Sequence, residues 1–209
     1  KLAFVSRGEL FVSDAEGKFI MEMQRGSAER VSEVKWLSDN KTLLFNQTLD
    51  GYLNLYTIAA DGSAAIKQLT ADKRNNRSVI LNGRKTMAVY LSGRDEVRIV
   101  DLKSFESKTI VKDEIWGFQN SDPGFSPDGA YVLFTAVRNF EQDIFIHNIK
   151  QNTTTDLTNT AITEASPVWS PDSKYIYFTS SRLQPSYPRG LQDPRIYRLP
   201  LQKLDLPYK

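Results

Sequence analysis

The chain has 209 residues, of which 40% are hydrophobic and 25% charged, and its formal net charge is +2 at pH 7. That composition is ordinary for a globular protein, and so small a net charge does not indicate nucleic acid as a partner, because binding it requires a clustered basic face. The lack of cysteine excludes disulfides and thiol catalysis, and no apolar run approaches the roughly 20 residues that membrane insertion needs.

A short pattern recurs along the chain: a bulky apolar residue, a tight polar turn, and a second bulky apolar residue nine positions after the first. The four pairs are Trp36 with Phe45, Ile80 with Val89, Phe125 with Phe134, and Trp169 with Phe178. The first members are separated by 44, 45 and 44 residues. A repeat of about 40 to 50 residues built from short strands is typical of a β-propeller, in which each repeat is one four-stranded blade.

Further strands are expected between these anchors, in apolar and β-branched segments bounded by turn residues. Second strands are predicted at Thr42–Gln47 and Tyr131–Ala136. Third strands are predicted at Leu55–Ile58, Ile99–Leu102, Ile146–Ile149 and Ile196–Leu199, and fourth strands at Ala65–Thr70 and Thr154–Leu157.

The two ends of the array lack parts of a blade. Phe4 and the strand Leu10–Val12 match second and third strands, so the first blade has no innermost strand, and only Leu201–Lys209 remains for the last strand. We therefore expect an all-β fold, a single β-propeller domain or arc over 1–209 with about five four-stranded blades, incomplete at both ends. The blades are expected at about 1–28, 31–70, 76–111, 118–158 and 162–206. An arc of a larger ring, within a longer protein, is favoured over a closed five-bladed ring.

The repeated turns explain the aspartates Asp39, Asp128 and Asp172. Proline presets the first central position of a tight turn, and Asp, Asn and Gly tolerate the positions that follow it. We expect these carboxylates to form turns, because no set of metal ligands accompanies them.

The sequence contains no recognisable catalytic set and predicts no cofactor and no metal site. The only histidine, His147, falls within a predicted strand, where a packed or edge position is expected, and no G-x-S-x-G nucleophile motif occurs.

Two features are candidates for binding. An arginine follows the second strand in four blades, as Arg7, Arg94, Arg138 and Arg182. On one face of a propeller these four would attract carboxylates or acidic peptides, and the alternative is that each pairs with the neighbouring blade or turn. The second feature is the long connection Ser181–Arg195, which contains three prolines, Tyr187 and Arg189. Long loops on rigid scaffolds often carry function, so a lid or a docking element is one interpretation and an inert excursion is the other.

The repeats Phe125-Ser-Pro-Asp-Gly129 and Trp169-Ser-Pro-Asp-Ser173 resemble the propeller repeats shared by TolB, prolyl oligopeptidases and tricorn proteases. The opening Leu2–Val12 and the closing Arg195–Leu201 narrow the resemblance to the second propeller of tricorn-like serine peptidases. In that family this propeller precedes a PDZ-like domain and an S41-type catalytic domain, and it is thought to guide peptides to the active site.

The resemblance implies a non-catalytic propeller domain that governs the access of peptides or unfolded polypeptides to an active site outside this chain. Its partners would be the adjoining PDZ-like and catalytic domains, with self-association at the open ends. The alternative is a TolB-like scaffold for envelope proteins, and a propeller enzyme such as a lyase is disfavoured. A periplasmic or other extracytoplasmic location is favoured over the cytoplasm.

Overall fold

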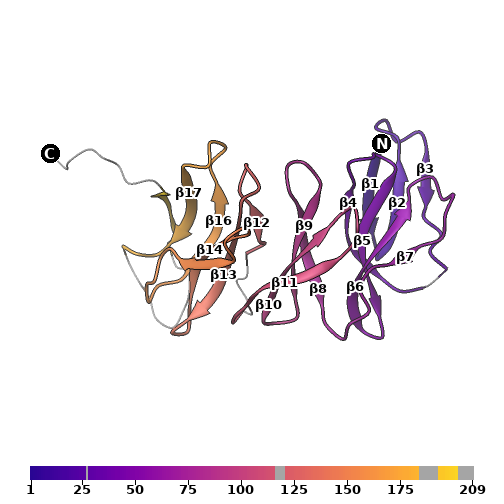
Figure 1. Cartoon of the computed structure of the whole chain (residues 1–209). Helices are drawn as coiled ribbons and strands as arrows, with labels where there is room; N and C mark the ends of the chain where they lie inside the picture. Colours follow the sequence, from indigo (N-terminus) through magenta and orange to yellow (C-terminus); the bar gives the residue numbers. More distant parts are fainter. Residues whose placement is uncertain (27, 116–120, 184–192, 202–209) are drawn as a thin grey trace.

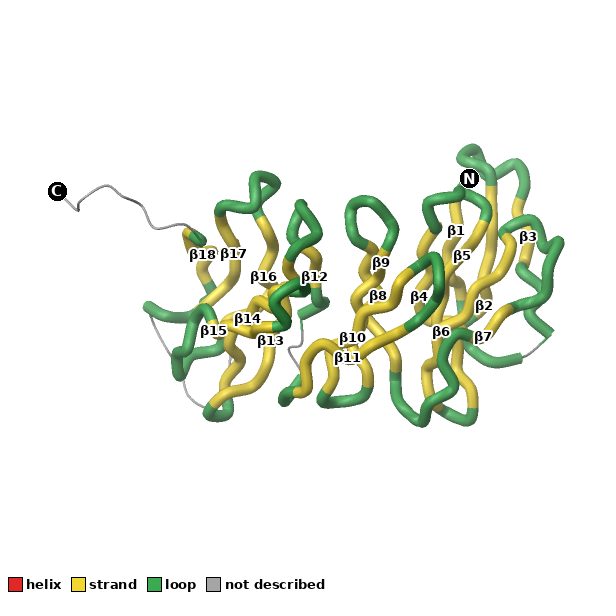
Figure 2. The backbone as a smooth tube through the Cα atoms, in the orientation of Figure 1, coloured by secondary structure: helices red, strands yellow, loops and turns green. Residues whose placement is uncertain are grey.

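The computed structural model describes residues 1–26, 28–115, 121–183 and 193–201. In these ranges the chain is all-β and forms five antiparallel sheets, each made of strands that follow one another in sequence. The sheets stand in a row in chain order, with the first and the last at opposite ends (Figures 1 and 2). These findings confirm the predicted propeller architecture. In the part of the chain that the structure describes, no helix has the length and apolarity to cross a membrane.

The first sheet contains β1 (Leu2–Ser6), β2 (Glu9–Ser13) and β3 (Ile20–Glu22). The second contains β4 (Val31–Trp36), β5 (Thr42–Leu49), β6 (Tyr52–Ala59) and β7 (Lys67–Gln68). The third contains β8 (Asn76–Leu81), β9 (Met87–Ser92), β10 (Glu96–Asp101) and β11 (Ser107–Lys112). The fourth contains β12 (Gly124–Phe125), β13 (Tyr131–Arg138), β14 (Glu141–Asn148) and β15 (Thr153–Asp156). The fifth contains β16 (Glu164–Trp169), β17 (Tyr175–Ser180) and β18 (Arg195–Pro200).

The hydrophobic core is divided among the junctions between neighbouring sheets. Alternate residues of a strand point to opposite faces of its sheet, so the second strand of each inner sheet packs against both neighbouring sheets. Phe45 lies in a cluster shared with the first sheet, whereas Leu44 lies in a cluster shared with the third. Phe134 likewise packs toward the third sheet and Leu133 toward the fifth.

The third copy of the repeat begins one residue later than its sequence suggests. The Asn82 amide bonds to the Met87 carbonyl, as the Leu37 amide bonds to Thr42 in the second sheet. Leu81 is therefore the counterpart of Trp36, and Tyr90, rather than Val89, is the counterpart of Phe45. The anchor at Ile80 was wrong because adjacent apolar residues precede a turn without the Ser-Pro-Asp marker.

Stacked aromatic pairs mark equivalent positions on the second and third strands. Ring centroids lie 5.4 to 5.8 Å apart in the pairs Phe4–Phe11, Phe45–Tyr56, Phe134–Phe145 and Phe178–Tyr197. In the third sheet Tyr90 faces Arg98 instead. The position of Phe4 in this series confirms that the first sheet lacks its innermost strand.

The innermost strands are joined across the junctions by hydrogen bonds to bulged backbone. A bulge leaves amides outside the strand ladder, and buried amides need an acceptor. In β8 the Ser78 and Val79 amides donate to the Glu33 carboxylate of the second sheet, at 2.8 and 2.9 Å. In β16 the Ser166 amide donates to the Ser121 hydroxyl at 2.8 Å. Residues about one repeat apart therefore connect successive sheets.

The two end sheets expose positions that are buried within the row. Phe45 and Phe134 are each 1% exposed, because a preceding sheet covers them, but Phe4 is 38% exposed. At the other end Ile196 is 77% exposed, whereas its counterparts Leu55 and Ile144 are fully buried. Both end sheets thus expose apolar side chains at positions that are buried in the inner sheets.

Candidate functional site

The four arginines singled out in the sequence lie at the same end of their second strands. Arg7 and Arg94 occupy the turns β1–β2 and β9–β10, Arg138 ends β13, and Arg182 follows β17. The side chains of Arg7 and Arg94 are exposed, and the other two are half-buried. The arginines are thus carried by four different sheets.

Arg138 and Arg182 bind carboxylates within the chain. Arg138 donates to both oxygens of Asp113, which directly follows β11 of the third sheet, at 2.7 and 2.6 Å, and this pairing raises the pKa of the guanidinium. Arg182 donates twice to the fully buried Glu164 of its own sheet, at 3.0 and 2.6 Å.

Both guanidinium groups also lie over rings of the stacked aromatic pairs. Arg138 is 4.7 Å from the centroid of Phe145, and Arg182 is 5.1 Å from that of Phe178. Such contacts stabilise the side chain in one place. Arg138 and Arg182 therefore have structural partners within the chain. Tyr187 and Arg189 lie outside the described residues, as does most of the loop Ser181–Arg195.

The turn aspartates have the role that the sequence predicts. The Asp128 Oδ1 atom accepts hydrogen bonds from the Ser126 hydroxyl and the Ala130 amide, and Asp172 repeats this arrangement with Ser170 and Lys174. These hydrogen bonds lower the pKa of both carboxyl groups, and the bond from the serine hydroxyl has the largest effect.

The single histidine is packed inside the fourth sheet, as expected. The His147 side chain is 1% exposed, its Nδ1 is 3.0 Å from the Thr154 hydroxyl, and burial lowers its pKa. His147 is therefore placed as a core residue of this sheet. Among the described ranges, no three His, Asp or Glu side chains gather in a way that would hold a metal ion.

Grooves open at one repeated position in three sheets. Each groove is lined by the residue that follows the second ring of the aromatic pair or its counterpart: Val12 in the first sheet, Ile99 in the third and Ile146 in the fourth. At the first and fourth sheets the groove also includes residues of the sheet that follows.

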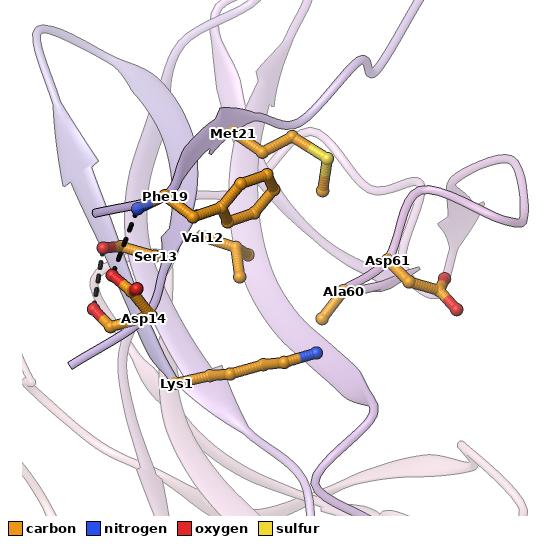
Figure 3. Close-up of a pocket in the computed structure, with 8 residues that line it drawn as sticks. All are labelled: Lys1, Val12, Ser13, Asp14, Phe19, Met21, Ala60 and Asp61. Carbon is orange, nitrogen blue, oxygen red and sulfur yellow. Dashed lines mark hydrogen bonds between the residues drawn. The ribbon is translucent and has the colours of Figure 1, made fainter. Parts of the chain in front are cut away.

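The first groove, between the first and second sheets, has a volume of about 200 Å³. Phe19 and Met21 lie above Val12, and the Lys1 side chain extends across the groove toward the segment that carries Ala60 and Asp61 (Figure 3). Hydrogen bonds from Ser63 lower the pKa of Asp61, and the positive charge of Lys1 lowers it further. The alkyl chain of Lys1 thus forms one wall of this groove.

The groove between the fourth and fifth sheets is larger, at about 480 Å³. Its lining combines apolar residues, including Ile146, Leu157 and Leu199, with the rings of Tyr131 and Trp169. These two rings are tilted against each other with centroids 6.3 Å apart. Asp128 and Asp156 also line it. Sequence reasoning missed this groove, because it forms between residues that are distant along the chain.

Comparison with known proteins supports the same architecture. The family model described as the TolB beta propeller domain matches residues 82–202. Among curated proteins, none matches the chain significantly. Among solved structures, the tricorn protease aligns with a TM-score of 0.76 and 19% identity over 95% of this chain. A putative TolB from Agrobacterium tumefaciens aligns with a TM-score of 0.62 and 17% identity, also over 95%.

An oligogalacturonate lyase in complex with manganese is similar as well, with a TM-score of 0.67 and 16% identity over 93% of this chain. The chain spans 20% of the tricorn protease, 72% of the TolB protein and 54% of the lyase. At these identities the likeness to the solved structures concerns the fold. The family model covers more than half of the sequence, and its match agrees with the sheets seen here, so this chain belongs to the TolB β-propeller domain family.

Proposed function

We propose that the chain is a non-catalytic propeller section of a tricorn-like peptidase and that it guides peptides toward an active site outside this sequence. The observation that carries the proposal is the pair of open end sheets. Their apolar faces, marked by Phe4 and Ile196, suit an arc that packs against further blades or domains of a larger protein. The similarity in fold to the tricorn protease supports the same view.

The exposed arginines supply a reason for peptide guidance. Arg7 and Arg94 place positive charge at one end of the sheets, where it attracts the carboxylates of peptides or unfolded polypeptides. In this proposal Arg138 and Arg182 also support the structure, because they form ion pairs with Asp113 and Glu164. The adjoining PDZ-like and catalytic domains are the proposed partners, and an extracytoplasmic location is proposed with them.

The test compares the natural full-length protein with its Arg7→Gln/Arg94→Gln variant. The proposal expects kcat/KM to fall about tenfold for peptides that end in a free carboxylate, the effect of losing about 1.4 kcal/mol of attraction. Peptides with an amidated end should be affected much less. Equal kinetics of the two proteins toward both peptides would remove the guiding role from these arginines.

A TolB-like scaffold for envelope proteins is the second candidate function. The match of residues 82–202 to the TolB propeller model favours it. The two candidates differ in chemistry, because a scaffold binds partner proteins and leaves them intact. Stable complexes with folded envelope proteins, without any peptide turnover by the natural protein, would favour the scaffold.

A further inference from the structure

We propose that the groove between the fourth and fifth sheets binds a peptide segment in which an apolar side chain stands next to a lysine or arginine. This site is separate from the proposed guidance of peptides by Arg7 and Arg94. The groove opens where β13 begins, whereas Arg138 lies at the other end of the same strand.

The floor of the groove suits an apolar group. Ile146, Leu157 and Leu199 line it, and its volume of about 480 Å³ falls in the range of sites that hold small ligands. Trp169 and Tyr131 are only half-buried, so their ring faces add apolar contact. An aliphatic or aromatic side chain would replace water on this floor and gain hydrophobic stabilisation.

The charges of the groove select the rest of the ligand. Asp128 and Asp156 lie in its lining, and none of the described residues that line it is lysine or arginine. The lowered pKa of Asp128 keeps that carboxyl group ionised at neutral pH. Asp156 also interacts electrostatically with Arg138, whereas Asp128 forms no ion pair within the described structure. The Asp128 carboxylate beside aromatic rings therefore favours a cation, both by charge and by cation–π attraction.

Each carboxylate also has an acceptor atom to offer. Asp128 accepts its hydrogen bonds through Oδ1, and Asp156 accepts those of the Thr158 and Asn159 amides through Oδ1 as well. Within the described structure, the Oδ2 atom of neither residue has a hydrogen bond. A ligand ammonium or guanidinium group can therefore bind without breaking these turns.

The first groove indicates which cation fits. There the alkyl chain of Lys1 lines the groove, and its positive charge lowers the pKa of Asp61 (Figure 3). Lys1 lies three residues before Phe4, and Tyr131 lies three residues before the equivalent Phe134. The larger groove therefore has an aromatic ring at the position where the first groove has a lysine. A ligand must then supply the positive charge.

The test uses peptides capped at both ends, so that side chains alone differ. Isothermal titration compares Ala-Leu-Lys-Leu-Ala with Ala-Leu-Glu-Leu-Ala on the intact chain. We expect the lysine peptide to bind at least about tenfold more tightly, a difference of about 1.4 kcal/mol. Asp128→Asn/Asp156→Asn, which keeps the Oδ1 acceptors, should abolish this preference. Asp39→Asn, at the same turn position in the second sheet, should retain it.

Circular dichroism melting shows whether each variant is folded. If the double variant does not fold, the titration is repeated with Asp128→Asn and with Asp156→Asn alone. Each single variant should reduce the preference for the lysine peptide. Three results would overturn the proposal: no binding of either peptide at millimolar concentration, equal binding of the two peptides, or an undiminished preference in the folded aspartate variants. None of them depends on peptide hydrolysis, so this test and that of the proposed function fail independently.

Discussion

Asp143 on β14 and Asn54 on β6 occupy the same position in their sheets and make the same hydrogen bonds. The Asp143 Oδ1 atom accepts from the Thr158 hydroxyl at 2.8 Å, and the Asn54 Oδ1 atom accepts from the Thr70 hydroxyl at 2.9 Å. Each also accepts the backbone amide two residues after that threonine. In the second sheet a side-chain amide therefore accepts the hydrogen bonds that a carboxyl group accepts in the fourth sheet.

The first prediction is that Asp143→Asn stabilises the chain at neutral pH by about 1 kcal/mol. Burial raises the pKa of Asp143, and its Oδ2 atom has no hydrogen-bond partner. The Asn54 amide donates to the carbonyls of Tyr52 and Asp72, and the fourth sheet has backbone carbonyls at the corresponding positions. The new amide would thus find acceptors.

The pH dependence follows from the sign of the shift. A carboxyl group with a raised pKa in the folded state favours folding when protonated, and that contribution is lost as the pH rises through the folded pKa. The advantage of Asp143→Asn should therefore be small below about pH 4 and grow toward neutral pH. Urea unfolding of both proteins across this range measures it. An asparagine variant less stable than the parent at pH 7 would contradict the prediction.

The second prediction concerns the link between Glu33 and the bulge of β8. Glu33→Ala leaves the Ser78 and Val79 amides without their acceptor, so we expect a loss of about 2 kcal/mol in the free energy of unfolding. Glu16→Ala, at an exposed position, serves as the matched control and should change stability little. If urea unfolding gives the same free energy for both variants, the carboxylate does not hold the two sheets together.

The third prediction concerns Arg138, whose pair with Asp113 joins the fourth sheet to the third. The side chain of Arg138 is 37% exposed, so solvent screening limits the pair, and Arg138→Ala should cost only about 1 kcal/mol. Arg7→Ala, at an exposed turn, should cost less than about 0.5 kcal/mol. Thermal or urea unfolding checks the order of the two variants, and a larger effect at Arg7 would contradict it.

The fourth prediction is that the isolated chain self-associates through its open end sheets. Leu2 is 54% exposed and Ile196 is 77% exposed, although the equivalent positions of the inner sheets are buried. Leu2→Lys/Ile196→Lys should therefore lower the association seen by sedimentation velocity. Phe140→Lys, at an 88% exposed turn residue away from these faces, should not. A wild-type chain that stays monomeric at high concentration would contradict this prediction.

Much of the architecture could be predicted from the sequence, because the relevant signals are local. The Ser-Pro-Asp turns fix where a strand ends, and the apolar pattern of Tyr131–Ala136 identifies the strand that follows. The third copy of the repeat was predicted one residue too early, because both Ile80 and Leu81 are apolar and the turn after them lacks proline. Local patterns do not determine the register in such a case.

The contacts between sheets could not be predicted in this way. Nothing near Glu33 in the sequence indicates that its carboxylate accepts two amides of the next sheet, and nothing near Asp156 indicates a groove. The arginines illustrate the same limit, because their positions after the second strands were visible but the pairing of Arg138 with Asp113 depends on the neighbouring sheet. Side-chain partners across a junction require the three-dimensional arrangement.

The most direct measurement is peptide hydrolysis by the natural full-length protein, compared with the isolated chain of residues 1–209. A guiding section of a tricorn-like peptidase predicts turnover of unfolded peptides by the full-length protein and none by the isolated chain. Turnover by the isolated chain, lost on a single substitution within it, would contradict the non-catalytic role. A full-length protein that binds partners but hydrolyses no peptide would contradict the peptidase assignment.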